Sequence, residues 1–339
     1  MKHLLTFSLA LLMAVSASAT VLRVNNSVGS SAPYTDLITA HAVATVGDTI
    51  YVEGSNTPYG SLTVTKRLVF IGPGYFLLEN PGTPASLEAV VNQFILDDDG
   101  TNDPTQGAAG TEIRGLSFTQ GSGSNTTIYV NDVLIAQCIF NQYIYMFEFD
   151  IVNTTIIQNY FVGQGFTFIN GNPGFNQLTF ANNIVNGLFR IPDNSSGLIF
   201  HNLFLGTVDV ESFNGEFRSN IATTTSATVS TTGTGNTSDN TSSTGQFGNT
   251  NGNNTASVSA LFVGPSGNST DGQYQLLPTA TQAKGNAHDG TDRGPFGGML
   301  PYVLSGQPDI PKVLTVITNT SPIFPSILLN VTVRATSGN

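Results

Sequence analysis

Residues 135–140 read IAQCIF, and five other segments follow the same pattern: IRGLSF (113–118), IQNYFV (157–162), FANNIV (180–185), FHNLFL (200–205) and FRSNIA (217–222). Consecutive segments start 22, 22, 23, 20 and 17 residues apart, and the first and usually the fifth places are apolar. A repeat of this length is typical of a solenoid, in which each coil buries its apolar face only by stacking on its neighbours. The sequence therefore predicts an all-β solenoid with parallel strands about 4.8 Å apart.

The third place of the pattern is glycine or polar, and in three segments it is asparagine: Asn159, Asn182 and Asn202. Asparagines that stack at one bend can bond to each other and to the turning backbone, where no strand pairing satisfies these groups. We predict a structural ladder formed by these three residues, rather than a catalytic role for them.

The start of the chain has the pattern of a secretory signal peptide. Lys2 precedes an apolar run over residues 4–15, and the small residues Ala17-Ser18-Ala19 follow as a cleavage site. We expect residues 1–19 to be removed, so that Thr20 begins the mature chain. The run is too short to span a bilayer, and no later stretch is apolar enough to do so. The mature protein is therefore predicted to have no membrane span and to be secreted, either extracellular or at the cell surface.

The composition limits the partners. The net charge is -11 with only 11 Lys and Arg residues, which argues against a nucleic-acid partner because such partners need basic patches. An extracellular polysaccharide or a cell-surface glycan stays open as the ligand, and bound Ca²⁺ would let an anionic one bind. The single cysteine, Cys138, cannot form an internal disulfide, and we expect it to be a small buried apolar residue.

Two regions resemble the ends of secreted right-handed parallel β-helix proteins of the pectate-lyase-like superfamily. Residues 34–74 are similar to their N-terminal part, with an expected short capping helix within Thr35–Val46, then Gly47-Asp48-Thr49-Ile50-Tyr51-Val52, Lys66 and Ile71-Gly72-Pro73-Gly74. Residues 289–298, DGTDRGPFGG, are similar to the end of many of these proteins. The resemblance implies a right-handed parallel β-helix over residues 20–298, the usual hand for parallel crossovers. It implies no single activity, because the superfamily includes lyases, hydrolases, epimerases, adhesins and non-catalytic proteins.

The C-terminal third has a different composition. Residues 223–259 are rich in Thr, Ser, Gly and Asn, and within a β-helix they would form either a long loop or a thin polar coil. Residues 299–339 are predicted to be a tail, with strands at Val313–Ile317 and Leu328–Val333 joined by a turn that contains proline. We expect a β-hairpin that covers the open edge of the last coil.

The candidate catalytic residues lie on a second strand that is expected upstream of each repeat, where residues alternating with inward side chains face solvent. If this register holds, one outward cluster contains Glu148, Asp150, Arg190, Asp209 and Glu211. Its carboxylates could share a proton or bind Ca²⁺, and Arg190 could bind a sugar carboxylate. The alternative is an Arg190–Asp209 ion pair on a solvated face, which would add little to stability.

Candidate binding residues are exposed tyrosines and one basic pair. The chain has no Trp, so an aromatic platform for sugars would use Tyr129, Tyr143 and Tyr145. His201 and Arg218 hold the same place in consecutive repeats and are expected to be outward neighbours. An arginine beside a histidine lowers the histidine pKa and can make it a base.

The candidate metal ligands lie in the densest acidic run, Asp97-Asp98-Asp99-Gly100-Thr101-Asn102-Asp103. Oxygen ligands in a loop that contains glycine can bind Ca²⁺, and Asp97, Asp99 and Asp103 are the candidates. The spacing of an EF-hand is absent, and a solvated turn between coils is the alternative.

Three functions are consistent with these patterns. The leading one is a secreted, non-catalytic glycan-binding or surface protein, because no catalytic motif is recognisable. The alternative is a polysaccharide lyase or glycoside hydrolase that uses the acidic cluster around Arg190. The third is an ice-binding or filament-forming solenoid, which would need a regular Thr column that the chain does not keep.

Overall fold

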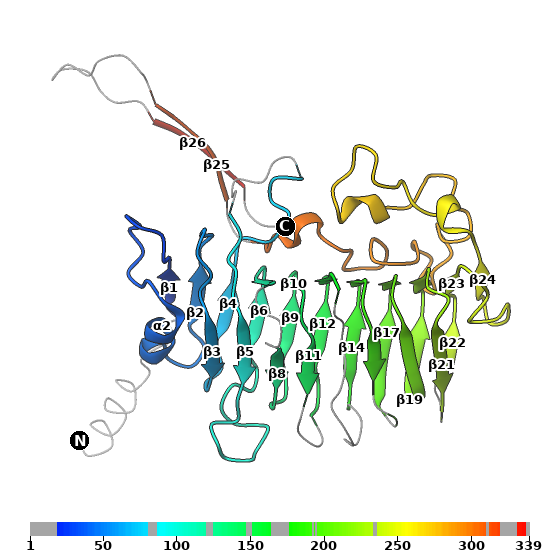
Figure 1. The fold of residues 1–339 in the computed structure, drawn as a ribbon, viewed down its shortest axis with the longest axis horizontal. Helices are drawn as coiled ribbons and strands as arrows, with labels where there is room; N and C mark the ends of the chain where they lie inside the picture. The colour runs from blue at the N-terminus through cyan, green and yellow to red at the C-terminus, as the bar shows by residue number, and fades with distance from the viewer. Residues whose placement is uncertain are drawn as a thin grey trace, which may run out of the picture.

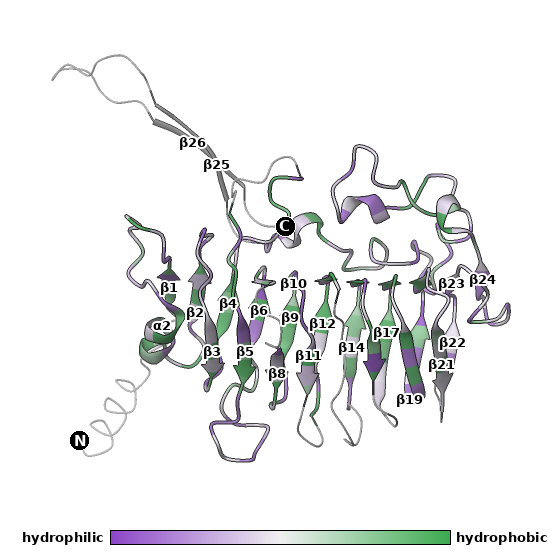
Figure 2. Cartoon of the chain, in the orientation of Figure 1, coloured by the Kyte–Doolittle hydropathy of each residue, from purple (hydrophilic) through white to green (hydrophobic). Residues whose placement is uncertain are grey.

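The chain folds as a parallel β-solenoid of stacked coils (Figure 1), and the predicted all-β fold class is confirmed. The computed structural model describes residues 19–80, 87–119, 125–146, 151–163, 176–191, 193, 195–232, 236–309, 312–318 and 331–336. The predicted signal peptide lies outside them, apart from Ala19. Apolar residues gather along the strands of the stack (Figure 2).

Three parallel sheets run along the stack. Sheet A contains β1 (Val21–Val24), β2 (Thr49–Val52), β4 (Val69–Ile71), β6 (Glu112–Arg114), β9 (Leu134–Ala136), β12 (Thr155–Ile157), β14 (Leu178–Ala181), β17 (Ser196–Phe200), the second part of β19 (Val208–Arg218) and β22 (Asn236–Ser238). Sheet B contains β3 (Ser61–Val64), β5 (Gln93–Leu96), β8 (Thr126–Ile128), β11 (Ile144–Met146), β16 (Phe189–Ile191), the first part of β19 and β21 (Ala227–Thr231). Sheet C contains β7 (Ser117–Phe118), β10 (Ile139–Phe140), β13 (Tyr160–Phe161), β15 (Ile184–Val185), β18 (Leu203–Phe204), β20 (Ile221–Ala222), β23 (Thr241–Ser242) and β24 (Asn254–Thr255). The polar residues 223–259 therefore contribute coils of the stack.

One inward column of sheet A corrects the predicted repeat. The residues paired across neighbouring coils and fully buried are Ile113, Ile135, Ile156, Phe180, Ile199 and Phe217. In two coils, the first place of the predicted segment, Ile157 or Phe200, lies one residue after the residue that is buried. The side chains of Ile157 and Phe200 point outward. A shift of one residue moves a strand side chain to the opposite face. In these two coils, the prediction therefore assigned the outward side chain to the core and the inward one to the surface.

The asparagine ladder exists, but one predicted member is wrong. It runs through Asn159, Asn183, Asn202, Asn220, Asn240 and Asn253, each of which accepts on its Oδ1 the backbone N–H of the preceding member or, for Asn159, of Cys138. Asn182 is not in this ladder, because its coil has two adjacent asparagines and the first lies in the turn with a φ of 54°. Its side chain points outward, and Asn183 takes the buried place.

A column of positive-φ residues precedes the ladder, one in each coil. It includes Gln137, Gln158, Asn182, His201, Ser219 and Asp239. A left-handed backbone conformation makes the sharp bend between sheets A and C, and it turns these side chains out of the stack. We name this column the turn column. Residues 256–309 are hydrogen-bonded to it.

Cys138 takes the place of an asparagine at the start of the ladder. It is fully buried, its N–H donates to Asn159 Oδ1 at 2.9 Å, and its Sγ lies 3.9 Å from the Ile113 carbonyl. Burial raises the pKa of the thiol to about 12, so the native thiol is inert.

We expect Cys138→Asn to extend the ladder. The Nδ2 of the new asparagine can donate to the Ile113 carbonyl of the preceding coil, as Asn159 Nδ2 donates to the Ile135 carbonyl. The free energy of unfolding should rise by about 1 kcal/mol, measured by urea denaturation. Cys138→Ala is the matched control and should lower it by about 1 kcal/mol. A Cys138→Asn protein less stable than Cys138→Ala would contradict this assignment.

Helix α2 (Leu37–Val43) lies at the β1 end of the stack (Figure 1). Asp36 caps its N-terminus by accepting the Thr39 N–H at 2.7 Å, and Leu37 and Ala40 are buried against the core. Val43, the last residue of the helix, is 53% exposed, and Lys66 Nζ donates to the carbonyls of His41 and Ala44 at this end of the helix.

Residues 256–309 form an arm that lies against sheet C and along the turn column. Sheet C presents an apolar outer face, with Ile139, Tyr160, Ile184, Leu203 and Ile221 in register on successive coils. Apolar residues of the arm cover this face and make a second core: Ala256, Leu261, Phe262, Ala280, Ala283 and Tyr302. Each large side chain buried in this way stabilises the fold by about 1.5–3 kcal/mol.

The tail beyond the arm contains β25 (Lys312–Thr318) and β26 (Val331–Thr336), which pair antiparallel. The predicted second strand, Leu328–Val333, overlaps β26 from residue 331 to residue 333, and residues 328–330 lie outside the described residues. The expectation that the hairpin covers the last coil stays a prediction, and the arm has returned to the early coils before the tail begins. Tyr75 N–H donates to the Ser305 carbonyl at 2.8 Å, which places this part of the arm beside the early coils.

Candidate ligand-binding groove

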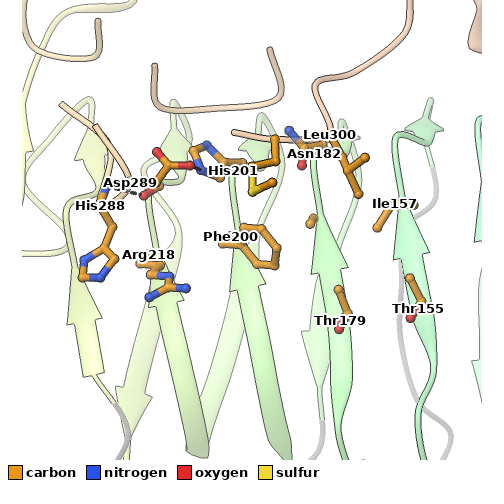
Figure 3. A pocket seen from close by; sticks show the side chains of 13 residues that line it. Thr155, Ile157, Thr179, Asn182, Phe200, His201, Arg218, His288, Asp289 and Leu300 are labelled. Atoms are coloured by element: carbon orange, nitrogen blue, oxygen red, sulfur yellow. Dashed lines mark hydrogen bonds and ion pairs between the residues drawn. The ribbon is translucent and has the colours of Figure 1, made fainter. Parts of the chain in front are cut away.

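A groove of about 380 Å³ lies between the outer face of sheet A and the arm (Figure 3). Strands β12, β14, β17 and β19 supply its floor, and the arm supplies its wall. The lining residues are Thr155, Ile157, Thr179, Ala181, Asn182, Phe200, His201, Arg218, Ser219, His288, Asp289, Met299 and Leu300.

The floor is built by strand register. Ile157, Ala181, Phe200 and Arg218 are direct partners on four successive coils, so their side chains form one outward row. Ala181 is the smallest of the four, and it leaves a depression between the Ile157 and Phe200 side chains.

The Phe200 ring is the aromatic surface of this floor. It meets the His201 ring at 73° with centroids 5.7 Å apart. Thr155 and Thr179 are partners on β12 and β14, two residues before Ile157 and Ala181. They add hydroxyl groups beside the apolar row. The floor therefore combines an aromatic face with hydrogen-bonding groups at its edge.

His201 and Asp289 form the polar end of the groove. His201 Nε2 lies 3.4 Å from Asp289 Oδ2, and the histidine is buried whereas Asp289 is exposed. Burial lowers the pKa of His201, and the Asp289 carboxylate partly offsets this effect. The ring is therefore mainly neutral at pH 7, and one of its nitrogens can accept a hydrogen bond.

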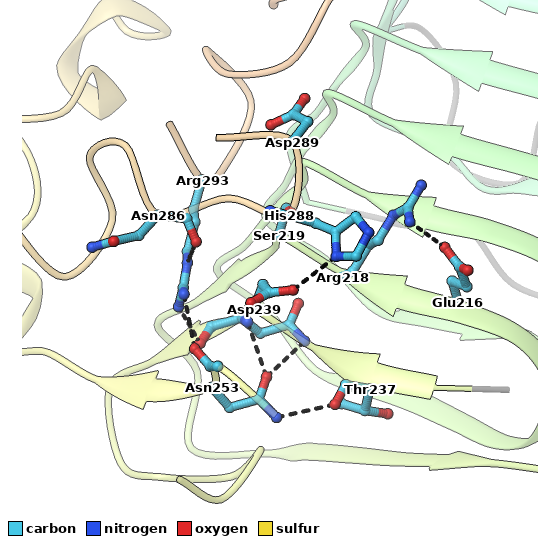
Figure 4. Close-up of polar contacts among 12 residues, drawn as sticks. Glu216, Arg218, Ser219, Thr237, Asp239, Asn253, Asn286, His288, Asp289 and Arg293 are labelled. Carbon is cyan, nitrogen blue, oxygen red and sulfur yellow. Dashed lines mark hydrogen bonds and ion pairs between the residues drawn. The ribbon is translucent and has the colours of Figure 1, made fainter. Parts of the chain in front are cut away.

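Two further polar contacts flank this end. Arg218 Nη1 contacts Glu216 Oε2 at 2.5 Å, and His288 Nδ1 contacts Asp239 Oδ2 at 3.0 Å (Figure 4). Both His288 and Asp289 are held by the turn column, since the His288 N–H donates to Ser219 Oγ at 2.9 Å. The arm thus adds two polar side chains to the groove.

Two exposed apolar residues form the rim. Met299 and Leu300 are 94% and 60% exposed, although the adjacent backbone is fixed by Gln158, whose Nε2 donates to the Leu300 and Pro301 carbonyls at 3.2 and 2.7 Å. The rim of the groove therefore carries an adjacent pair of exposed apolar side chains on a fixed backbone.

The structure places His201 and Arg218 differently from the prediction. They are not partners on neighbouring coils, because Arg218 pairs with Phe200 and His201 lies in the turn. Both still line the groove, since the turn and the end of the strand are adjacent.

The predicted catalytic cluster is only partly described, because Glu148 and Asp150 lie outside the described residues. Arg190, Asp209 and Glu211 line a shallow hollow of about 230 Å³ on sheet B, together with Asp193. Arg190 Nε contacts Asp209 Oδ2 at 2.6 Å across neighbouring coils. This is the cross-coil ion pair that the sequence offered as the alternative.

The three tyrosines are half-buried and lie on or beside sheet B, away from the groove. Tyr143 and Tyr145 stack with ring centroids 5.5 Å apart and planes 13° apart, and Tyr129 directly follows β8 on an adjacent coil. They provide a small aromatic surface.

The predicted Ca²⁺ ligands do not converge. In the described part of the chain, no three His, Cys, Asp or Glu side chains are arranged to hold a metal ion. Asp103 instead accepts the Thr105 N–H and hydroxyl at 2.9 and 2.7 Å, and Asp98 accepts the Gly100 N–H at 3.0 Å. The acidic run is a turn that its own side chains stabilise.

No family model, no curated protein and no solved structure matches this chain. The parallel β-solenoid is established by strand pairing alone, and the relation to the pectate-lyase-like superfamily stays a prediction. Among the described residues, no helix is both long and apolar enough to cross a membrane.

Sequence reasoning missed most of the groove. Phe200 was assigned to the core, and His288, Met299 and Leu300 come from the arm, which has no periodicity to predict its path. The available signal was the adjacent apolar pair Met299-Leu300 after the DGTDRGPFGG segment, which no core position accounts for.

Proposed function

We propose that this protein is an exported, non-catalytic glycan-binding β-solenoid whose ligand site is the groove on sheet A. The observation that carries this proposal is the Phe200 ring in a row of outward residues, bordered by Thr hydroxyls and by the His201–Asp289 pair. The signal-peptide pattern of residues 1–19 supports export.

A sugar ring has the surface that such a groove fits. Its C–H face packs on an aromatic ring, while its hydroxyl groups need donors and acceptors around the edge. Phe200 offers the ring, Thr155 and Thr179 offer hydroxyls, and Asp289 offers a carboxylate acceptor. The groove volume of about 380 Å³ suits a short oligosaccharide segment.

The hollow around Arg190 supports an enzyme less well. Its arginine is already bonded to Asp209, and an exposed pair of this kind is typical of a solvated surface. A lyase or hydrolase would release unsaturated or reducing ends from polysaccharides, which distinguishes it from a binding protein in one assay.

We expect Phe200→Ala to weaken glycan binding by about tenfold or more, because stacking on an aromatic ring contributes about 1–2 kcal/mol. The measurement is a glycan array with the mature protein, followed by titration calorimetry on the best ligand. Tyr143→Ala on sheet B is the matched control and should bind normally. An array without binding would contradict the function, and a loss confined to Tyr143→Ala would move the site to sheet B.

A further inference from the structure

The residue predicted to begin the mature chain is bonded to a buried carboxylate. The Thr20 N–H donates to Asp48 Oδ1 at 2.7 Å, and the Thr20 carbonyl accepts the Thr49 N–H at 2.8 Å. Asp48 is 5% exposed, whereas Ala19 and Thr20 are exposed. The start of the solenoid is therefore fixed at Thr20, one residue before β1.

The other carboxylate oxygen of Asp48 is already occupied. Asp48 Oδ2 accepts the Thr45 N–H at 2.7 Å and the Thr45 hydroxyl at 2.8 Å. These bonds from Thr20 and Thr45 hold the pKa of Asp48 below its usual range. The result is a fixed, ionised carboxylate with one oxygen directed at the Thr20 nitrogen.

We infer that the Ala19–Thr20 bond is a processing site and that Asp48 is the receptor for the N-terminus that cleavage creates. A signal-peptidase-class protease hydrolyses the bond with one water, which leaves a carboxylate on Ala19 and an amine on Thr20 that takes up a proton. The neutral N–H that meets Asp48 in the precursor becomes an ammonium group at the same place. A charge-assisted hydrogen bond replaces a neutral one and stabilises the first coil.

Two independent observations meet at one residue. The small residues Ala17-Ser18-Ala19 put the cleavage after position 19, and the structure puts the nitrogen of residue 20 on a buried carboxylate. A cut one residue earlier or later would move the ammonium by about 3.8 Å, beyond contact with Asp48. The inference rests on the proposed export of the chain and is independent of the glycan groove.

The titratable groups on the neighbouring elements are the same before and after cleavage. His41 is on α2, Lys66 and Arg67 are on the segment after β3, and Arg23 and Tyr51 are on β1 and β2. Burial lowers the pKa of His41. Comparing proteins that differ only at the N-terminus therefore removes the contributions of these groups.

To test this, the full chain is secreted from a host with a signal peptidase, and the N-terminus of the product is determined by mass spectrometry. The melting temperatures of two chains made in vitro are then compared. One begins at Thr20, and the matched control begins at Ala19 and keeps its ammonium group one residue away. We expect the secreted protein to begin at Thr20 and to melt about 2–4 °C higher than the Ala19 control. In an Asp48→Asn background this difference should disappear.

The pH dependence gives a second readout. Pairing with Asp48 raises the pKa of the Thr20 amine above the value of about 7.7 for an unfolded chain. The pairing of this ammonium group with Asp48 therefore contributes fully to the free energy of unfolding below about pH 7.7. This contribution is lost as the pH rises through the pKa of the amine in the folded protein. A secreted protein with a different first residue would overturn the inference. So would equal melting temperatures of the two chains at pH 6.5, and neither result would bear on glycan binding.

Discussion

Replacing Asn202 by Ala should lower the free energy of unfolding by about 3–5 kcal/mol. Asn202 is fully buried. Its Oδ1 accepts from the backbone and side-chain nitrogens of Asn183 at 2.9 and 3.0 Å, and its Nδ2 donates to the Phe180 carbonyl at 2.8 Å. Alanine removes these bonds and takes away the acceptor of the buried Asn183 backbone N–H, whereas the Asn183 Nδ2 keeps its bond to the Ile156 carbonyl. A buried donor that loses its acceptor costs about 1–3 kcal/mol, and the loss of the other bonds adds to this cost.

The ladder is continuous, so the damage should spread along the stack. In a solenoid, each coil is stabilised mainly by its two neighbours, and Asn202 connects the coil of Asn183 to the coil of Asn220. Hydrogen exchange should accelerate first in β15, β18 and β20, which follow the three ladder residues. Urea denaturation measures the overall loss.

Asn186→Ala is the matched control, because Asn186 is exposed and lies three residues after ladder member Asn183. It should change the free energy of unfolding by less than about 0.5 kcal/mol. Asn202→Thr supplies one hydroxyl in place of the amide and should lose less stability than Asn202→Ala, so it provides the measurement if the alanine variant fails to fold. Equal stabilities of Asn202→Ala and Asn186→Ala would show that the ladder is not structural.

The sequence predicted the solenoid because its period is long and its core residues are large. It did not predict the register in every coil, because Ile156-Ile157 and Ile199-Phe200 are adjacent apolar pairs. Either member of such a pair can be placed inside by pattern alone. Only pairing across coils, in which Ile156 meets Ile135 and Phe180, decides which one is buried.

The sequence did not predict a groove between sheet A and the arm. His201 and Arg218 were selected as outward polar residues, and they do line it. Its wall comes from an arm of loops and short 3₁₀ turns that returns along the stack, and its path is set by contacts far apart in sequence. Asn182 illustrates this, since its Nδ2 bonds the Pro295 and Gly297 carbonyls at 2.9 and 2.8 Å.

Arg293 fixes this arm to the last coils, and Arg293→Ala should lower the free energy of unfolding by about 3–5 kcal/mol. The side chain is 3% exposed. Its Nε donates to the Asn286 carbonyl at 2.8 Å, its Nη1 to the Asn240 carbonyl at 2.7 Å, and its Nη2 to the Gly252 carbonyl at 2.8 Å (Figure 4). One planar group therefore joins the arm to two successive coils.

Lysine cannot replace this arrangement, because a single ammonium group does not reach three carbonyls in the directions that the guanidinium fork supplies. We expect Arg293→Lys to recover less than half of the lost stability, measured by thermal and urea denaturation. Arg190→Ala is the matched control, since Arg190 is exposed and pairs with one surface carboxylate, and it should cost about 0–1 kcal/mol.

Because the arm also carries His288 and Asp289, the Arg293 variants should lose glycan binding together with stability, whereas Phe200→Ala should lose binding alone. A stable Arg293→Ala protein would mean that the apolar contacts on sheet C hold the arm without it.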